Sequence, residues 1–144
     1  MTLSRGFYSF IPQKGDSWRW PNFSPAELAC HCGWCGGTYF HDPDFLDGLQ
    51  RVRSRIGRPL RINSGYRCAI HNKEVGGADR SQHQVMAADV SLEGHDRWDL
   101  HEAFKAEGFS GFGFGSTFLH VDQRPDPATW YYGTDSVLAW ERPG

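Results

Sequence analysis

The chain has 144 residues, a formal net charge of −2 and a pI near 6.4. That length suits one domain with a buried core and is too short for two, so we predict a single domain over residues 1–144. The charge lacks the surplus of Lys and Arg that binding to nucleic-acid phosphates requires, which argues against nucleic acid as a partner.

The first residues show neither periodicity nor an apolar stretch long enough for a signal peptide or a membrane span. We therefore expect synthesis in the cytoplasm and no membrane insertion. We also expect a monomeric protein. Residues 1–22 are expected to be irregular.

Two helices are predicted in the first half of the chain. Ser24-Pro25-Ala26-Glu27 is a capping box with proline at the first helical position, which predicts a short helix ending near Cys30. A longer helix is predicted between its cap at Asp42 and the stop signal at Gly57, because apolar residues recur there at helical spacing. These apolar residues are Phe45, Leu46, Leu49, Val52 and Ile56.

The second half is predicted to hold short strands around one helix. Alternating runs predict strands over 60–64 and 87–92, and Asp96 is expected to cap a helix that ends at Gly108. Residues 111–114 and 118–122 are expected to form a hairpin. This order of elements predicts an α+β fold with a short antiparallel sheet flanked by helices.

Three residues form a candidate metal site. Catalytic zinc usually has three protein ligands, histidines and a carboxylate among them, and keeps one position for water. His83, Asp89 and His120 offer such a set, and a carboxylate in the apolar run around Asp89 is costly unless it is paired or binds metal. Spacing alone fits a turn-capping aspartate and two surface histidines equally well.

A longer series of motifs resembles one known family. The motifs occur in a fixed order: Asn63-Ser64-Gly65-Tyr66-Arg67, His71-Asn72, Val75-Gly76-Gly77-Ala78, Ser81-x-His83, Ala88-Asp89 and His120-Val121-Asp122. Over Phe23 to Trp130 the chain resembles the zinc D-Ala-D-Ala carboxypeptidase and endopeptidase superfamily, particularly its short endolysin-like members from phages and gene-transfer agents. The resemblance implies the zinc fold that these D,D-peptidases share with Hedgehog proteins.

The resemblance also assigns roles to residues. It implies that His83, Asp89 and His120 bind zinc, that Arg67 binds the substrate carbonyl or carboxylate, and that Ser81 lines the same cleft. A guanidinium suits the role of Arg67, because it can donate two parallel hydrogen bonds to a carboxylate or an oxyanion. The loop between His83 and Asp89 is one residue shorter than is usual in the family and lacks its glycine.

Two roles are open for Asp122, which lies on the same strand face as His120. It is a candidate general base that removes a proton from zinc-activated water and passes it to the leaving amine. Equally, it is a candidate partner that orients a zinc-bound imidazole.

The cysteines form a second constellation. Cys30, Cys32, Cys35 and Cys68 match a closed structural zinc site, with His31 as a substitute ligand, while unligated or disulfide-paired cysteines are the alternative. The remaining histidines, namely His41, His95 and His101, are interpreted as helix-terminal or surface residues. A third set is interpreted as core rather than as a wall that packs against substrate: Trp130, Tyr131 and Tyr132.

The sequence therefore predicts a zinc peptidase that hydrolyses stem or cross-link peptides of bacterial peptidoglycan after release to the cell wall, by a holin or another route. A noncatalytic, zinc-stabilised wall-binding or phage structural module is the main alternative. A cytoplasmic dipeptidase acting on D-Ala-D-Ala is a third. The bond that is cleaved stays open between that of a D,D-carboxypeptidase or D,D-endopeptidase and that of an endolysin of the L-Ala-D-Glu type.

Overall fold

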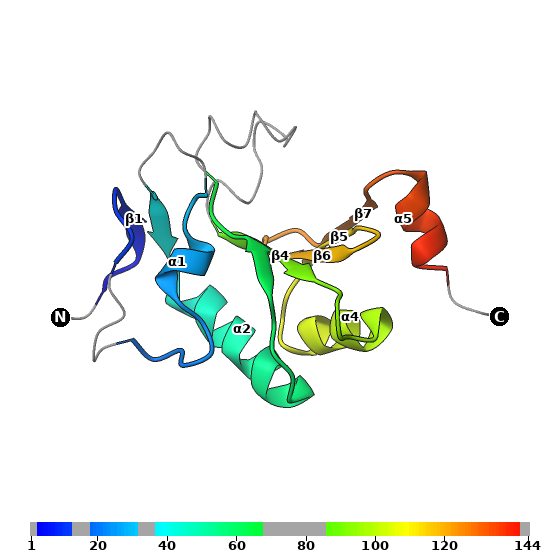
Figure 1. The fold of residues 1–144 in the computed structure, drawn as a ribbon, viewed down its shortest axis with the longest axis horizontal. Helices are drawn as coiled ribbons and strands as arrows, with labels where there is room; N and C mark the ends of the chain where they lie inside the picture. The colour runs from blue at the N-terminus through cyan, green and yellow to red at the C-terminus, as the bar shows by residue number, and fades with distance from the viewer. Residues whose placement is uncertain (1–2, 13–17, 32–36, 68–85, 142–144) are drawn as a thin grey trace.

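The computed structural model shows two sheets and four helices in the part of the chain that it describes (Figure 1). In the smaller sheet, β1 (Gly6–Tyr8) pairs antiparallel with β2 (Tyr39–His41). The segment expected to be irregular thus contains one short strand. The structure describes residues 3–12, 18–31, 37–67 and 86–141.

The larger sheet has five strands and carries the candidate site. Neighbouring strands are antiparallel except for β5 (Gly111–Phe114) and β7 (Ala128–Tyr131), which are parallel. The predicted strands and hairpin are confirmed, and β7 is an addition that the sequence did not indicate. The order across the sheet is β3 (Ile62–Ser64), β4 (Ala87–Ser91), β6 (Phe118–Asp122), β5 (Gly111–Phe114) and β7 (Ala128–Tyr131).

The two longer helices begin at the predicted caps. The Asp42 carboxylate accepts hydrogen bonds from two backbone N–H groups of the first turn of α2 (Pro43–Ile56), and Gly57 ends that helix with φ of 65°. The Asp96 carboxylate caps α4 (Arg97–Ala106) in the same way. The helices are α1 (Pro25–Leu28), α2 (Pro43–Ile56), α4 (Arg97–Ala106) and α5 (Thr134–Ala139). The helices and the mixed sheet confirm the predicted α+β class. No helix among the described residues combines the length and the apolar character needed to cross a membrane.

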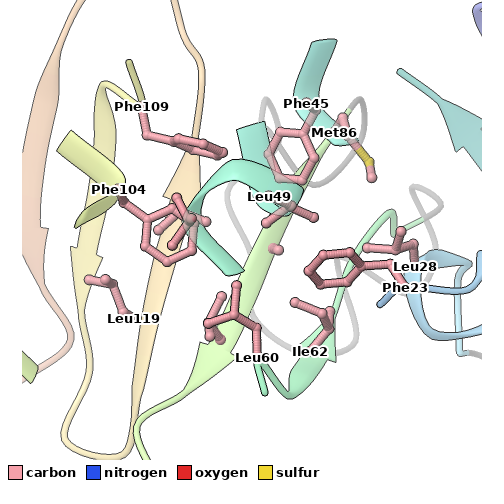
Figure 2. Close-up of a cluster of buried hydrophobic side chains, with 14 of the residues drawn as sticks. Phe23, Leu28, Phe45, Leu49, Leu60, Ile62, Met86, Phe104, Phe109 and Leu119 are labelled. Carbon is pink, nitrogen blue, oxygen red and sulfur yellow. The ribbon is translucent and has the colours of Figure 1, made fainter. Parts of the chain in front are cut away.

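The core lies between the large sheet and the helices. Figure 1 shows α2 and α4 on the same side of this sheet, and Figure 2 shows Leu49 of α2 and Phe104 of α4 in one buried cluster with Leu119 of β6. Because strand side chains alternate, Leu119 points into this core while His120 and Asp122 project from the other face. The core face therefore leaves the opposite face for polar residues.

A bulge and a tight contact direct the chain toward Arg67. Ile62 pairs with Val90 and Ser64 pairs with Asp89, so β3 carries one extra residue at Asn63. Beyond the bulge, the backbone N–H of Tyr66 donates to the carbonyl of Leu28 at 2.9 Å. Gly65 permits this approach, because a Cβ there would lie 2.6 Å from the same carbonyl oxygen.

We predict that Gly65→Ala lowers the free energy of unfolding by about 1–3 kcal/mol, the usual cost of overpacking. The overlapping atoms of Leu28 are backbone and cannot move aside as a flexible side chain would. Denaturant unfolding measures the effect. Asn63→Ala, an exposed change in the same strand, is the control and should shift stability by less than about 0.5 kcal/mol. Equal stability of the two variants would show that the contact with Leu28 is not tight.

His41 is buried, so its interpretation as a surface residue is wrong, while its place directly before Asp42, the N-cap of α2, agrees with the helix-terminal alternative. It lies in β2 with 2% of its surface exposed, its Nδ1 is 2.9 Å from the hydroxyl of Tyr39, and the rings of Trp18 and Trp20 pack against it. Burial lowers the pKa of His41 below its ordinary value, although the charge of Asp42 opposes this. The imidazole is therefore buried in its neutral form.

This burial predicts a loss of stability in mild acid. As the pH falls below about 6.5, the unfolded chain binds a proton at His41 before the folded protein does, so the free energy of unfolding decreases. His41→Gln removes the titrating group and should flatten the stability profile between neutral pH and about pH 5 relative to the wild type. Denaturant midpoints across this range test the prediction, and parallel profiles of the two proteins would contradict it.

Candidate functional site

Asp89 and His120 face each other across two neighbouring strands. They are direct partners in the antiparallel register of β4 and β6, and the Oδ1 atom of Asp89 lies 3.1 Å from the Nδ1 atom of His120. His120 is buried, whereas the Asp89 side chain keeps 19% of its surface exposed. The pair thus has a buried side and a side that solutes can reach.

Asp122 holds the other nitrogen of the same imidazole. Its Oδ2 atom lies 2.7 Å from His120 Nε2, and its carboxylate also accepts three hydrogen bonds from Arg124, at 3.1, 2.9 and 2.7 Å. No surface of Asp122 is exposed. Four hydrogen bonds occupy about all the acceptor positions that a carboxylate has.

These contacts determine the protonation pattern of His120. An ionised carboxylate only accepts, so Nε2 must carry a proton toward Asp122. In the neutral imidazole Nδ1 then has a lone pair that faces the acceptor Oδ1 of Asp89 at 3.1 Å. Two acceptors at this distance repel each other unless a proton or a cation lies between them.

The pKa values follow the same geometry. Burial acts to lower the pKa of His120, but the hydrogen bonds with Asp122 and Asp89 together raise it above its ordinary value. Burial acts to raise the pKa of Asp122, and the bonds from Arg124 and His120 instead hold it well below its usual range. Asp122 is therefore an anion at neutral pH.

The pair of Asp89 and His120 fits a zinc ion. Two ligands of a tetrahedral zinc with bonds of about 2.0–2.1 Å lie roughly 3.3 Å apart, close to the observed 3.1 Å. Donation from a ligating histidine to a carboxylate through its other nitrogen is also typical of zinc sites. Among residues 3–12, 18–31, 37–67 and 86–141, no group of three or more His, Cys, Asp or Glu side chains is placed to hold a metal. The predicted third ligand, His83, lies outside the described residues, as does Ser81.

Arg67 is a half-buried side chain at the end of the segment that Gly65 and Leu28 hold in place. Its Nε atom is buried and has no hydrogen-bond partner in the described structure. A buried donor without a partner is costly, so this atom is available to a ligand that accepts a hydrogen bond. That property agrees with the predicted role in binding a carbonyl or carboxylate.

Trp130 of β7 and Tyr132, the residue after that strand, lie on the face of the sheet that carries the site, whereas Tyr131 packs on Phe114. Tyr131 and Tyr132 have 50% and 45% of their surface exposed, so their interpretation as core is wrong. Trp130 is half-buried and its ring centre lies 5.0 Å from that of His120. Partial burial raises the pKa of Tyr132, the charge of Asp89 adds to the rise, and its bond with Trp130 opposes it.

Sequence reasoning missed Arg124 entirely. Its position two residues after Asp122 and four after His120 was a usable signal, because residues at every second position share a strand face. Trp130 lacked such a signal, since β7 itself was not predicted.

Of the four cysteines, Cys30 is the one that lies among the described residues. Cys30 is buried, and its backbone N–H donates to the carbonyl of Thr38 at 2.8 Å. The bond between Tyr66 and Leu28 brings the segment that precedes Cys68 beside the segment that carries Cys30. The other three cysteines, Cys32, Cys35 and Cys68, lie outside the described residues.

One groove of the described structure lies away from these residues. It has a volume of about 630 Å³, runs along α2 on the helix-covered side, and is lined by charged residues such as Arg51, Arg55 and Glu107. None of the predicted site residues lines it, and Arg51 and Arg55 are occupied in ion pairs with Glu107. We therefore place the candidate site at His120.

Comparisons with known proteins identify the family of the chain. A zinc D-Ala-D-Ala carboxypeptidase from Streptomyces albus G is 32% identical over 98 residues, which are 62% of this chain and 38% of that protein. The chain therefore spans well under half of the length of this relative. The model of the peptidase M15 family matches residues 21–122, a range that includes every predicted zinc ligand. The predicted resemblance is confirmed, and the chain belongs to the peptidase M15 family.

Proposed function

We propose that this protein is a zinc-dependent peptidase that hydrolyses peptide bonds in the stem or cross-link peptides of bacterial peptidoglycan. Membership of a peptidase family supports the reaction, and the name of the Streptomyces relative supports a substrate that contains D-alanine. The observation that carries the proposal is the approach of His120 Nδ1 to the Asp89 carboxylate at 3.1 Å, a separation that suits two ligands of one zinc ion.

In this proposal zinc is held by His83, Asp89 and His120. Zinc, when bound, supplies a Lewis acid that polarises a carbonyl and lowers the pKa of water to about 7. The protein contributes two ligands from adjacent strands of one sheet, where their separation is set by the backbone register. A site built on strands holds its ligands more precisely than one built on loops.

Arg67 is proposed to bind the carbonyl or the terminal carboxylate of the peptide, and Ser81 to line the same cleft. Among the described residues the Nε of Arg67 has no hydrogen-bond partner, which supports this role, since a ligand oxygen would satisfy it. A guanidinium donates to an oxygen more strongly as negative charge develops there. Arg67 would thus lower the barrier to attack on the carbonyl.

For Asp122, the geometry favours the orienting role over the general base. Its four hydrogen bonds leave no acceptor position for a proton from water, and Arg124 stabilises its charged form. We therefore propose that Asp122 fixes the tautomer of His120. The role of Asp122 as a general base stays the alternative, and it would require one of these hydrogen bonds to break.

The reaction can be tested directly. With zinc present, the protein should release new peptides from purified peptidoglycan, detected by mass spectrometry, and Asp89→Ala or His120→Ala should abolish release. Arg67→Ala should lower kcat/KM about 10²–10³-fold, because it removes donors to the developing oxyanion. Arg61→Ala, which removes an exposed arginine directly before β3, is the matched control and should leave kcat/KM unchanged.

Two results would count against the peptidase. Zinc binding and retention on peptidoglycan without any product would favour the noncatalytic binding module, in line with the shortened loop between His83 and Asp89. Cleavage of free D-Ala-D-Ala but not of peptidoglycan would favour the dipeptidase.

We also propose that Cys30, Cys32, Cys35 and Cys68 bind a second, structural zinc. The burial of Cys30 supports this proposal, and so does the hydrogen bond between Tyr66 and Leu28, because it brings the residues that precede Cys68 beside the segment that carries Cys30. Such a site would tie the position of Arg67 to that of α1.

Elemental analysis tests this second ion. The wild type should contain two zinc ions per chain, and Cys30→Ser should lose one of them together with thermal stability, because a structural zinc contributes folding free energy. His120→Ala should lose the other zinc. A wild type with one zinc ion that Cys30→Ser keeps would contradict the structural site.

A further inference from the structure

Four side chains, among them the candidate zinc ligand His120, form a closed ring of contacts. The Nε2 atom of His120 bonds to Asp122 at 2.7 Å, and Asp122 bonds to the guanidinium of Arg124 at 2.9 and 2.7 Å. The guanidinium lies over the ring of Trp130, 4.6 Å from its centre. The ring of Trp130 in turn lies 5.0 Å from His120.

Two glycines of β5 make room for this ring of contacts. A Cβ at Gly111 would lie within 2.5 Å of Asp122 and of the Arg124 Nε atom, and a Cβ at Gly113 would lie 2.6 Å from the Nε1 atom of Trp130. Gly113 is paired with His120 on one side and with Trp130 on the other. The absence of side chains on this face of β5 lets Arg124 and Trp130 close over β6.

We propose that Arg124 and Trp130 are positioning residues, which hold His120 in the tautomer and orientation that present its Nδ1 atom to zinc. The inference rests on the proposed function and adds to it the residues that maintain the metal site.

Arg124 acts through Asp122. It fills three acceptor positions of the carboxylate and leaves one for the Nε2–H of His120, so that Asp122 can neither rotate nor bind elsewhere. Trp130 acts by packing, because its ring covers both the guanidinium and the imidazole. Loss of a partner behind a metal-binding histidine typically weakens metal affinity 10–100-fold.

Matched variants separate positioning from general damage. Arg124→Gln should weaken zinc affinity 10–100-fold, and Arg124→Lys should weaken it less. Trp130→Ala should also weaken zinc affinity, and Trp130→Phe should keep most of the affinity that Trp130→Ala loses. Arg97→Gln is the control for Arg124, because Arg97 also lies over a tryptophan, at 5.5 Å, away from the candidate site. Tyr131→Ala controls for Trp130, since Tyr131 packs on Phe114. Both controls should bind zinc as the wild type does.

Two readouts are needed, zinc affinity by chelator competition and the side-chain nitrogen spectrum of His120 in the metal-free protein. The wild type should show a slowly exchanging Nε2–H proton that Arg124→Gln loses and Arg97→Gln keeps. If Arg124→Gln does not fold, the zinc affinity and the Nε2–H signal of Arg124→Lys, Trp130→Ala and Trp130→Phe test the inference instead. Wild-type affinity and an intact Nε2–H signal in the folded Arg124 and Trp130 variants would overturn the inference. A wild type that binds no zinc and releases no peptide would instead overturn the proposed function, and the spectra would still decide whether Arg124 holds His120.

Discussion

The buried carboxylate of Asp122 is the constraint around which the candidate site is organised. A buried charge is costly unless it is paired and hydrogen-bonded, and Asp122 meets this condition through His120 and Arg124. The same bonds decide which nitrogen of His120 carries its proton. Because Nε2 carries a proton toward Asp122, Nδ1 is the nitrogen that faces Asp89.

The sheet supplies the neighbours that this arrangement needs. β6 lies between β4 and β5, so His120 has Asp89 on one side and Gly113 on the other. Asp89 contributes a carboxylate. Gly113 has no side chain, and Trp130 occupies the space where its Cβ would lie. Since strand side chains alternate, the apolar residues between these positions can pack on α2 and α4 without disturbing the polar face.

Local signals predicted much of the fold. The caps of α2 and α4, the apolar face of α2 and the β5–β6 hairpin are all confirmed, because each depends on residues close together in the chain. The strands that were missed are short and are stabilised by distant partners: β2 pairs with β1, and β7 pairs in parallel with β5. His41 was misjudged for the same reason, since Trp18 and Trp20 cover it from a segment without periodicity.

By itself, the sequence determined the α+β class, the peptidase family and the candidate ligands Asp89 and His120, because ordered motifs and side-chain alternation are properties of the chain. Only the tertiary structure decided that Asp89 faces Nδ1 of His120, that Asp122 is saturated by Arg124, and that Trp130 packs on the imidazole. These contacts join strands and loops whose pairing no local pattern specifies. They form because a buried charge is costly unless it is paired, and this cost can be assessed only when the surrounding side chains are in place.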